Sequence, residues 1–278
     1  KPFATMQAAY DAGGVCQFIG PGTFAGITKT TANIALRFMG SGATTISLVR
    51  VINPSGNSIT LQDLGVHSAV VISVEIYGAG GADDNTGSNG GAVTLHNIYG
   101  VSVQSTGGAA GSTTEFGSPQ IGGNGGSVTT NGNCVLANLY TYGGTGGIPY
   151  DDGFSMANGN IGGDGGSVTV YGSLTATDIT TYGASGGSGL YGGTNGYAGN
   201  GAPISADILK ATTITGSGDG TAGTGTNLTV KHSAFIGTFD GTASTPGTIS
   251  GQGVRIDTLT GGTPSNLVMS NVGGTAYP

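Results

Sequence analysis

The chain has 278 residues, including 59 glycines, and only 8% of its residues are charged. Globular domains average about 7% glycine and roughly 25% charged residues. The net charge of −7, with only seven lysines and arginines, excludes a surface that binds a phosphate backbone, so no nucleic-acid partner is expected. Interleaved valine, isoleucine and leucine runs, with 36% hydrophobic residues overall, favour an ordered chain over low-complexity disorder.

A short helix is predicted at the amino terminus. Thr5 can serve as the N-cap of a helix over 6–12, and the glycine pair at 13–14 supplies a left-handed exit. A first strand follows over 15–19. Residues 1–14 are therefore interpreted as a helical cap on the fold that follows.

One phrase then recurs along the chain. A β-branched run leads through a tyrosine or a small residue into a glycine-rich stretch, as at 71–81, 139–147 and 179–187. An internal repeat of tens of residues is typical of a solenoid, in which each unit buries its apolar face against its neighbours. The repeat therefore predicts stacked coils of short parallel strands.

The spacing of the strand starts separates bare coils from coils that carry inserts. Ile34, Ile46, Ile59 and Val71 fall 12, 13 and 12 residues apart, so two strands give a coil of about 24 residues. Equivalent later starts are 34, 35, 40, 36, 24 and 21 residues apart, at Ile59, Val93, Val128, Val168, Ile204, Leu228 and Ile249. The longer steps predict glycine-rich inserts after the same strand each time.

Inserts at one place on successive coils must leave one side of a solenoid. The five expected here are 78–91, 107–126, 143–166, 183–201 and 216–225. Glycine-rich segments without bulky side chains can pack backbone to backbone in an extended, polyglycine-II-like form with three residues per turn. We therefore expect lateral inserts that are ordered by main-chain hydrogen bonds.

The opening of the chain resembles a known family. The phrase from Met6 to Phe24, with its helix, Gly-Gly, strand, Pro-Gly and aromatic residue, is similar to the start of pectate-lyase-like right-handed parallel β-helix proteins, which include many phage tailspikes. The resemblance covers about 20 residues and implies a fold rather than an activity. It also suggests a homotrimer, because tailspike β-helices are often parallel trimers.

Taken with the spacing, this resemblance predicts one all-β domain. Its expected parts are a helical cap at 1–14, bare coils at 15–77, coils with glycine-rich inserts at 78–225 and bare terminal coils at 226–278.

The inserts carry a second resemblance, to the distal tail adhesins of T-even-like phages. In those proteins glycine-rich elements form a rigid layer, and the segments between them recognise the host. The resemblance implies a virion tail or an extracellular, cell-surface location. It also implies a cell-surface polysaccharide or an outer-membrane protein as partner.

The candidate binding residues are the bulky and acidic side chains between glycine runs. An aromatic side chain at a loop tip costs exposed apolar area unless it meets a partner or folds back over the glycine layer. Both readings, and a third in which the residues form an enzyme subsite, stay open for Tyr150, Asp151, Asp152, Phe154, Met156, Glu115, Phe116, Leu190, Tyr191 and Tyr197.

The residue patterns of catalytic and metal sites are largely missing from the sequence. The acid doublets 83–84 and 151–152 lie in flexible context, and the second lacks the spaced acids of a calcium loop, so no cofactor is expected and calcium is only an alternative. The three histidines are scattered, and no Gly-x-Ser-x-Gly elbow leads into a helix. Tryptophan, on which sugar-cleaving clefts often stack their substrates, is absent.

The sequence therefore favours a non-enzymatic recognition protein. A polysaccharide lyase or hydrolase on the same scaffold is one alternative. A structural or ice-binding surface protein is another, although only scattered Thr-x-Thr pieces, such as 175–177 and 213–215, are evident.

No apolar run approaches the roughly 20 residues that cross a bilayer, so membrane insertion is not expected. Cys16 and Cys134 are interpreted as buried free thiols.

Overall fold

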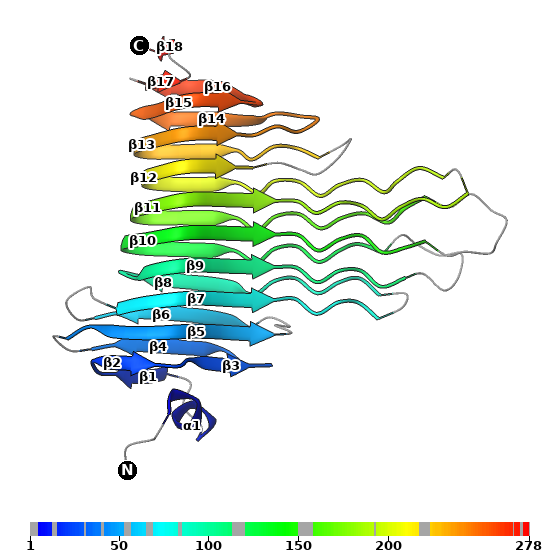
Figure 1. The fold of residues 1–278 in the computed structure, drawn as a ribbon. Helices are drawn as coiled ribbons and strands as arrows, with labels where there is room; N and C mark the ends of the chain where they lie inside the picture. The colour runs from blue at the N-terminus through cyan, green and yellow to red at the C-terminus, as the bar shows by residue number, and fades with distance from the viewer. Residues whose placement is uncertain are drawn as a thin grey trace.

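The computed structural model is an all-β solenoid with one short helix (Figure 1). The structure describes residues 5–12, 16–30, 32–39, 42–52, 57–64, 69–82, 85–112, 120–149, 158–191, 193–216, 223–268, 270–272 and 275–277. Its strands form one continuous sheet that coils upward from β1 near the amino terminus to β18 near the carboxyl terminus. Within these residues only β17 and β18 pair in antiparallel fashion.

The elements follow one another in the order of the rungs. The first part of the chain comprises α1 (Met6–Asp11), β1 (Cys16–Ile19), β2 (Gly22–Phe24), β3 (Ile27–Lys29), β4 (Ile34–Phe38), β5 (Thr44–Ile52), β6 (Ser58–Asp63), β7 (Ala69–Tyr77), β8 (Ala92–His96) and β9 (Tyr99–Thr106). The second part comprises β10 (Val128–Tyr142), β11 (Val168–Tyr182), β12 (Ile204–Thr215), β13 (Leu228–Asp240), β14 (Gly247–Gln252), β15 (Val254–Thr260), β16 (Gly262–Val268), β17 (Ser270–Val272) and β18 (Thr275–Tyr277).

The predicted helix begins where its cap was expected. Thr5 Oγ1 accepts a hydrogen bond from the Ala8 amide at 3.1 Å, as an N-cap does. The helix α1 contacts β3, and Gln7 Oε1 accepts a hydrogen bond from the Thr28 amide at 2.9 Å. Asp11 forms an ion pair with Lys29 of the same strand.

Each rung has two walls. Wall 1 consists of β4, β6, β8, the amino-terminal halves of β10 to β13, and β14. Wall 2 consists of β5, β7, β9, the carboxyl-terminal halves of β10 to β13, and β15. In β10 to β13 one long strand bends through both walls, which is why these strands have 12 to 15 residues.

The core is a set of stacked apolar columns between the walls. The predicted strand starts pair with one another in unbroken register on wall 1, and each is at most 1% exposed, at Ile34, Ile59, Val93, Val128, Val168, Ile204, Leu228 and Ile249. The predicted equivalence of these positions is therefore confirmed, although β6 and β8 begin one residue earlier than predicted and β14 begins two residues earlier. Burying a Val, Leu or Ile side chain contributes about 1.5–3 kcal/mol, so these columns are the main stabilising feature of the solenoid.

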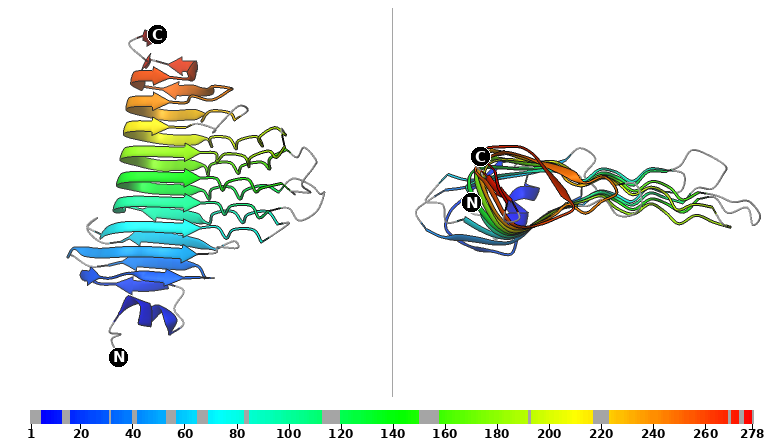
Figure 2. Two further views of the ribbon diagram at one scale, coloured as in Figure 1. Left: turned by 45° about the vertical axis from the view of Figure 1, so that its right-hand side comes forward. Right: turned by 90° about the horizontal axis from the view of Figure 1, so that it is seen from above.

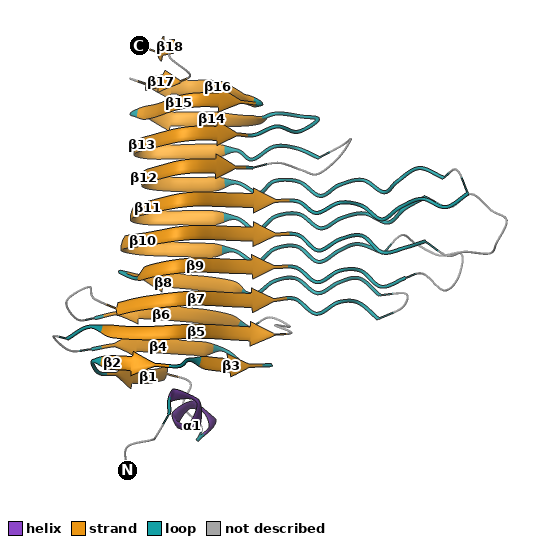
Figure 3. Ribbon diagram, viewed as in Figure 1, coloured by secondary structure: helices purple, strands orange, loops and turns teal. Residues whose placement is uncertain are grey.

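The glycine-rich segments leave the solenoid on one side. Seen from above, they run outward in parallel from a single edge of the coil (Figure 2). They have no regular helix or strand along most of their length (Figure 3). Each leaves at the carboxyl end of wall 2 and returns to the start of wall 1 on the next rung. We call these segments the arms, and the half of each that leads away from the solenoid and the half that leads back its outgoing and returning legs. The arms are the described residues within 78–91, 107–127, 143–167, 183–203 and 216–227.

Candidate functional site

The legs of successive arms are joined by main-chain hydrogen bonds with a period of three residues. In the outgoing legs, the Gly78 and Gly81 amides donate to the carbonyls of Thr106 and Ala109, both at 2.7 Å. In the returning legs, Gly122 and Gly125 donate to Ile161 and Asp164 in the same way. A three-residue period means that neighbouring residues along a leg point in three different directions.

A second set of bonds joins the outgoing legs to the returning legs. The amides of Gly123, Gly144 and Gly163 donate to the carbonyls of Gly108, Gly123 and Gly144, at 2.7–2.8 Å. Ala184 continues the series by donating to Gly163 at 2.9 Å. These bonds zigzag between the two layers of legs and bind the arms into one block. They also satisfy backbone groups that an ordinary long loop leaves to water.

Only glycine fits at the crowded positions of this block. A Cβ atom at Gly144 would lie 1.9 Å from the carbonyl oxygen of Gly108, and one at Gly108 would lie 1.7 Å from that of Ala79. Real Cβ atoms do not approach backbone so closely. Gly80, by contrast, faces outward and would place a Cβ atom 3.8 Å from its nearest neighbour.

Buried hydroxyl groups attach the arms to the solenoid. Ser105 Oγ donates to the Gly91 carbonyl and accepts from the Gly126 amide, both at 3.0 Å. Thr141 Oγ1 donates to the Gly166 carbonyl at 2.6 Å. Both hydroxyls are completely buried at the end of wall 2. The arms therefore begin in a satisfied polar junction rather than in a hinge.

The third direction along each leg points to solvent, and it carries the larger side chains. On the returning legs, the bonds of Gly122 and Gly162 align Ile121, Ile161 and Tyr197 in one column. Ile121 is 43% exposed and Tyr197 is 64% exposed. The glycine block thus presents apolar and aromatic side chains on a backbone that is held on both sides.

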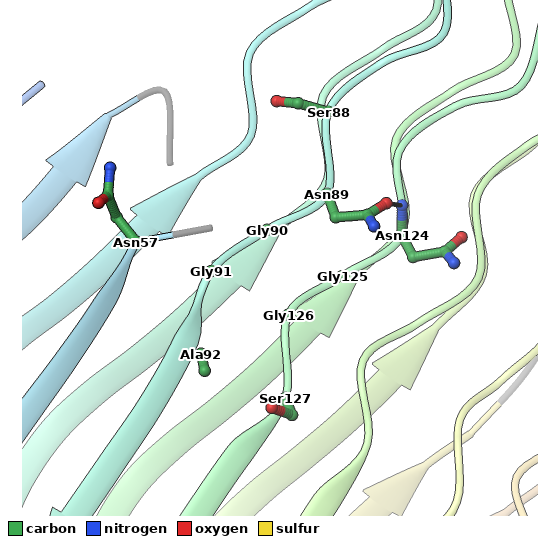
Figure 4. A pocket seen from close by; sticks show the side chains of 10 residues that line it. All are labelled: Asn57, Ser88, Asn89, Gly90, Gly91, Ala92, Asn124, Gly125, Gly126 and Ser127. Atoms are coloured by element: carbon green, nitrogen blue, oxygen red, sulfur yellow. Dashed lines mark hydrogen bonds between the residues drawn. The ribbon is translucent and has the colours of Figure 1, made fainter. Parts of the chain in front are cut away.

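A ladder of amide and carboxylate side chains runs beside this column. The side chain on each rung accepts a hydrogen bond from the backbone amide on the next rung. Asn89 accepts from the Asn124 amide at 2.8 Å (Figure 4). Asn124 accepts from the Asp164 amide at 2.9 Å, and Asp164 accepts from the Asn200 amide at 2.7 Å. Thr224 ends the ladder by donating to Asn200. Each of the four Asn and Asp residues directly precedes a glycine at the base of a returning leg. Sequence reasoning missed this ladder, although the Asn-Gly-Gly and Asp-Gly-Gly motifs at 89–91, 124–126 and 164–166 were visible.

The ladder borders a shallow polar hollow where the arms meet wall 1. The hollow has a volume of about 540 Å³ and is lined by Asn57, Ser88, Asn89, Gly90, Gly91, Ala92, Asn124, Gly125, Gly126 and Ser127 (Figure 4). None of these described lining residues is charged. Its amides and hydroxyls can donate to and accept from a neutral polar ligand.

Tyrosines occupy the opposite face, at the start of the outgoing legs. The Tyr140 and Tyr142 rings stack with centroids 5.6 Å apart, and Tyr142 meets Tyr182 edge to face at 6.4 Å. Burial raises the pKa of Tyr142, and the neighbouring Tyr140 adds to the effect. The Tyr142 phenol therefore stays protonated at neutral pH and can donate a hydrogen bond from this ring cluster.

A charged cluster lies on the rungs below the tyrosines. Glu75 accepts hydrogen bonds from Arg50 Nε at 2.7 Å, from Ser73 at 2.8 Å and from Tyr77 at 3.2 Å. Burial opposes ionisation of Glu75, but the bonds from Ser73 and Arg50 outweigh it and lower the pKa of this carboxyl. Burial and the Glu75 charge both raise the pKa of Tyr77. The cluster is internally satisfied and serves to fix the wall.

The predicted binding residues fall into two groups. The first group lies outside the described residues and comprises Tyr150, Asp151, Asp152, Phe154, Met156, Glu115 and Phe116. Leu190, Tyr191 and Tyr197 are described. Leu190 is half-buried and Tyr191 is 52% exposed with a φ of 48°. Tyr191 and Tyr197 therefore present aromatic side chains to solvent on the arms, while Leu190 does so only in part.

Two further kinds of reactive side chain among the described residues are potential metal ligands and free thiols. In the part of the chain that is described, no three His, Cys, Asp or Glu side chains gather as metal ligands, and no helix is long and apolar enough to cross a membrane. Cys134 is a buried free thiol, as predicted, and burial raises its pKa. The side chain of Cys16 lies outside the described residues.

Comparison with known proteins adds no family. No family model, no curated protein and no solved structure matches this chain.

Proposed function

We propose that this protein is a non-enzymatic recognition protein that attaches to a cell-surface glycan or an outer-membrane protein through its arms. The observation that supports this most is the regular placement of exposed side chains on a hydrogen-bonded glycine block. Tyr197 and Ile121 stand in one outward column of the returning legs, beside the ladder that begins at Asn89 and Asn124.

The physical advantage of such a block is pre-organisation. Binding normally costs about 0.5–1.5 kcal/mol for each side chain that it immobilises, and more for a loop that must be ordered. Here the backbone is already fixed by main-chain bonds. Tyr191 supports this reading, because a non-glycine residue at φ 48° is held in a sparsely populated conformation that costs about 1–3 kcal/mol. Strain of this kind persists where the surroundings impose it, and it is often found at binding sites.

Three features of the fold belong to the same proposal. We infer that the coil is right-handed, that α1 caps its first rung, and that the arms form a polyglycine-II lattice. The three-residue bonding period supports the lattice, and the contacts of α1 with β3 support the cap. The right-handed coil follows the general rule for connections between parallel strands of one sheet. A tail adhesin of a phage, or another extracellular attachment protein, is the biological setting that fits them best.

The test is binding of the labelled full chain to a panel of Gram-negative cells by flow cytometry. Replacing Tyr191 or Tyr197 with Ala should reduce binding at least tenfold, because aromatic side chains dominate binding surfaces. Tyr171→Ala is the matched control, since Tyr171 is 57% exposed on wall 1, away from the arms. Periodate treatment of the cells should abolish binding to a glycan, and proteinase K should abolish binding to a protein. No binding across the panel, or equal loss with Tyr171→Ala, would refute the proposal.

Ice binding is a second candidate, favoured by a feature of wall 1 that the sequence concealed. The strand register stacks hydroxyl side chains in one outward column over seven rungs, at Thr60, Thr94, Thr129, Thr169, Ser205, Thr229 and Ser250. Rungs repeat every ~4.8 Å, which spaces these uncharged hydroxyl groups evenly along one line. Sequence inspection found only scattered Thr-x-Thr pieces because the column is interrupted by the arms. The test is the thermal hysteresis of a solution of the full chain, which is the gap between its melting and freezing points. A solution that freezes without such a gap would refute ice binding.

A further inference from the structure

A groove lies at the amino-terminal end of wall 2, at the other end of the rungs from the arms. Its volume is about 330 Å³. The strand register aligns Thr175, Lys210 and Phe235 in one column across β11, β12 and β13. The remaining exposed side chains of its lining are Val135, Thr177 and Thr212. The groove is thus independent of the surface proposed above.

Lys210 is an unpaired cation in an acidic protein. The chain carries a net charge of −7, and Lys29, Arg50, Lys231 and Arg255 each lie beside a carboxylate. Arg50 pairs with Glu75, and Lys231 lies 3.7 Å from Asp207. Lys210 is exposed and has no ion-pair partner among the described residues. Its charge is therefore available to an anionic group that enters the groove.

Phe235 supplies a fixed aromatic surface next to this cation. Its side chain is 42% exposed, and the Arg255 guanidinium lies 4.8 Å from the ring centroid. Arg255 is itself held by Asp257, whose Oδ1 accepts a hydrogen bond from Nε at 2.9 Å. A cation over a ring face contributes about 0.5–1 kcal/mol at an exposed site, so it favours this orientation of the ring before any ligand arrives.

We propose that this groove binds a carboxylated sugar residue, a hexuronic acid, of a surface glycan. The Lys210 ammonium donates charge-assisted hydrogen bonds to the carboxylate. The apolar C–H face of the sugar ring packs on Phe235, and the hydroxyls of Thr175, Thr177 and Thr212 bond to its ring hydroxyls. Arg255, on the rung next to Phe235, is already paired with Asp257, so Lys210 is the cation that the described lining leaves for a ligand. One such cation suits a single carboxylate, whereas a polyphosphate would need a row of unpaired cations.

The test uses purified full chain and soluble ligands, so it does not depend on cell attachment. Isothermal titration calorimetry is run with a hexuronate tetramer, with the same tetramer after reduction of its carboxyls to alcohols, and with an acidic Glu hexapeptide. We expect the hexuronate to bind at least tenfold more tightly than the other two. Binding should also weaken with added salt, because the attraction is partly screened.

Variants assign the binding to the groove. Lys210→Met and Phe235→Ala should each weaken hexuronate binding at least tenfold, while Lys231→Met, which removes a nearby exposed cation, should change it less than twofold. Tyr197→Ala should leave it unchanged. Thermal melts of each variant exclude loss of fold. Equal affinity for the reduced tetramer, equal or tighter binding of the peptide, or full binding by Lys210→Met would each overturn the proposal, and none of these results bears on the arms.

Discussion

Substitution of Gly144 by Ala is the sharpest test of how the arms are held. The added Cβ would lie 1.9 Å from the carbonyl oxygen of Gly108, so the legs must move apart. Overpacking of this kind costs about 1–3 kcal/mol. The shift also weakens two bonds, from Gly144 to Gly123 at 2.7 Å and from Gly163 to Gly144 at 2.8 Å, each worth about 0.5–1.5 kcal/mol. The expected total is about 2–6 kcal/mol.

The matched control is Gly80→Ala, in which the new methyl group has room because its nearest atom lies 3.8 Å away. Native-state proteolysis with subtilisin measures opening of the arms, and urea unfolding measures the whole fold. We expect subtilisin to cut Gly144→Ala at least tenfold faster in the arms than it cuts Gly80→Ala. Global unfolding of Gly144→Ala, reported by the urea midpoint, should be affected less than this local opening of the arms. Equal cleavage of the two variants would refute the reasoning that the legs are in backbone contact.

Three further predictions concern the ladder, the walls and the core. Asn124→Ala removes the acceptor of one amide bond, so it should destabilise the chain by about 0.5–1.5 kcal/mol in urea unfolding; no change would mean that the ladder is not formed. The pKa of Glu75 is lowered, so its stabilisation is present at neutral pH and is lost as the pH falls through its folded pKa; Glu75→Gln should cost about 1–3 kcal/mol at pH 7, with the difference from wild type vanishing at pH 2. A constant difference at both pH values would contradict this. Because burial raises the pKa of Cys134, iodoacetamide should alkylate this residue at least 100-fold more slowly in the native chain than in urea, as followed by peptide mass spectrometry; rapid native labelling would place the thiol at the surface.

The sequence predicts the scaffold well because its signals are local and repeated. The β-branched runs that begin at Ile59, Val93 and Val128 recur with small-residue flanks, and their inward positions must stack once the chain coils. The direction of the arms follows from the same register, since all inserts leave after the same strand. These features are set by hydrophobic pattern and spacing, which a single sequence displays.

The details of the candidate site depend on contacts between distant rungs. Asn89, Asn124 and Asp164 lie 35 and 40 residues apart, and only their common place before Gly-Gly marks them as a ladder. The groove is even less visible, because Lys210 and Phe235 are neighbours only through the pairing of β12 with β13. The sequence shows which residues of the inserts are aromatic. Whether such a side chain is exposed depends on which of the three directions along the leg it points in, and the sequence does not show this direction.

Amide hydrogen exchange of the full chain, followed by mass spectrometry, tests the central claim most directly. The amides of Gly108, Gly123, Gly144 and Gly163 donate to carbonyls of neighbouring legs. The account predicts that peptides covering these residues exchange as slowly as those of β10 and β11, over hours. Exchange within seconds, at the rate of an unstructured glycine-rich peptide, would contradict it and would remove the fixed surface on which the proposed attachment depends.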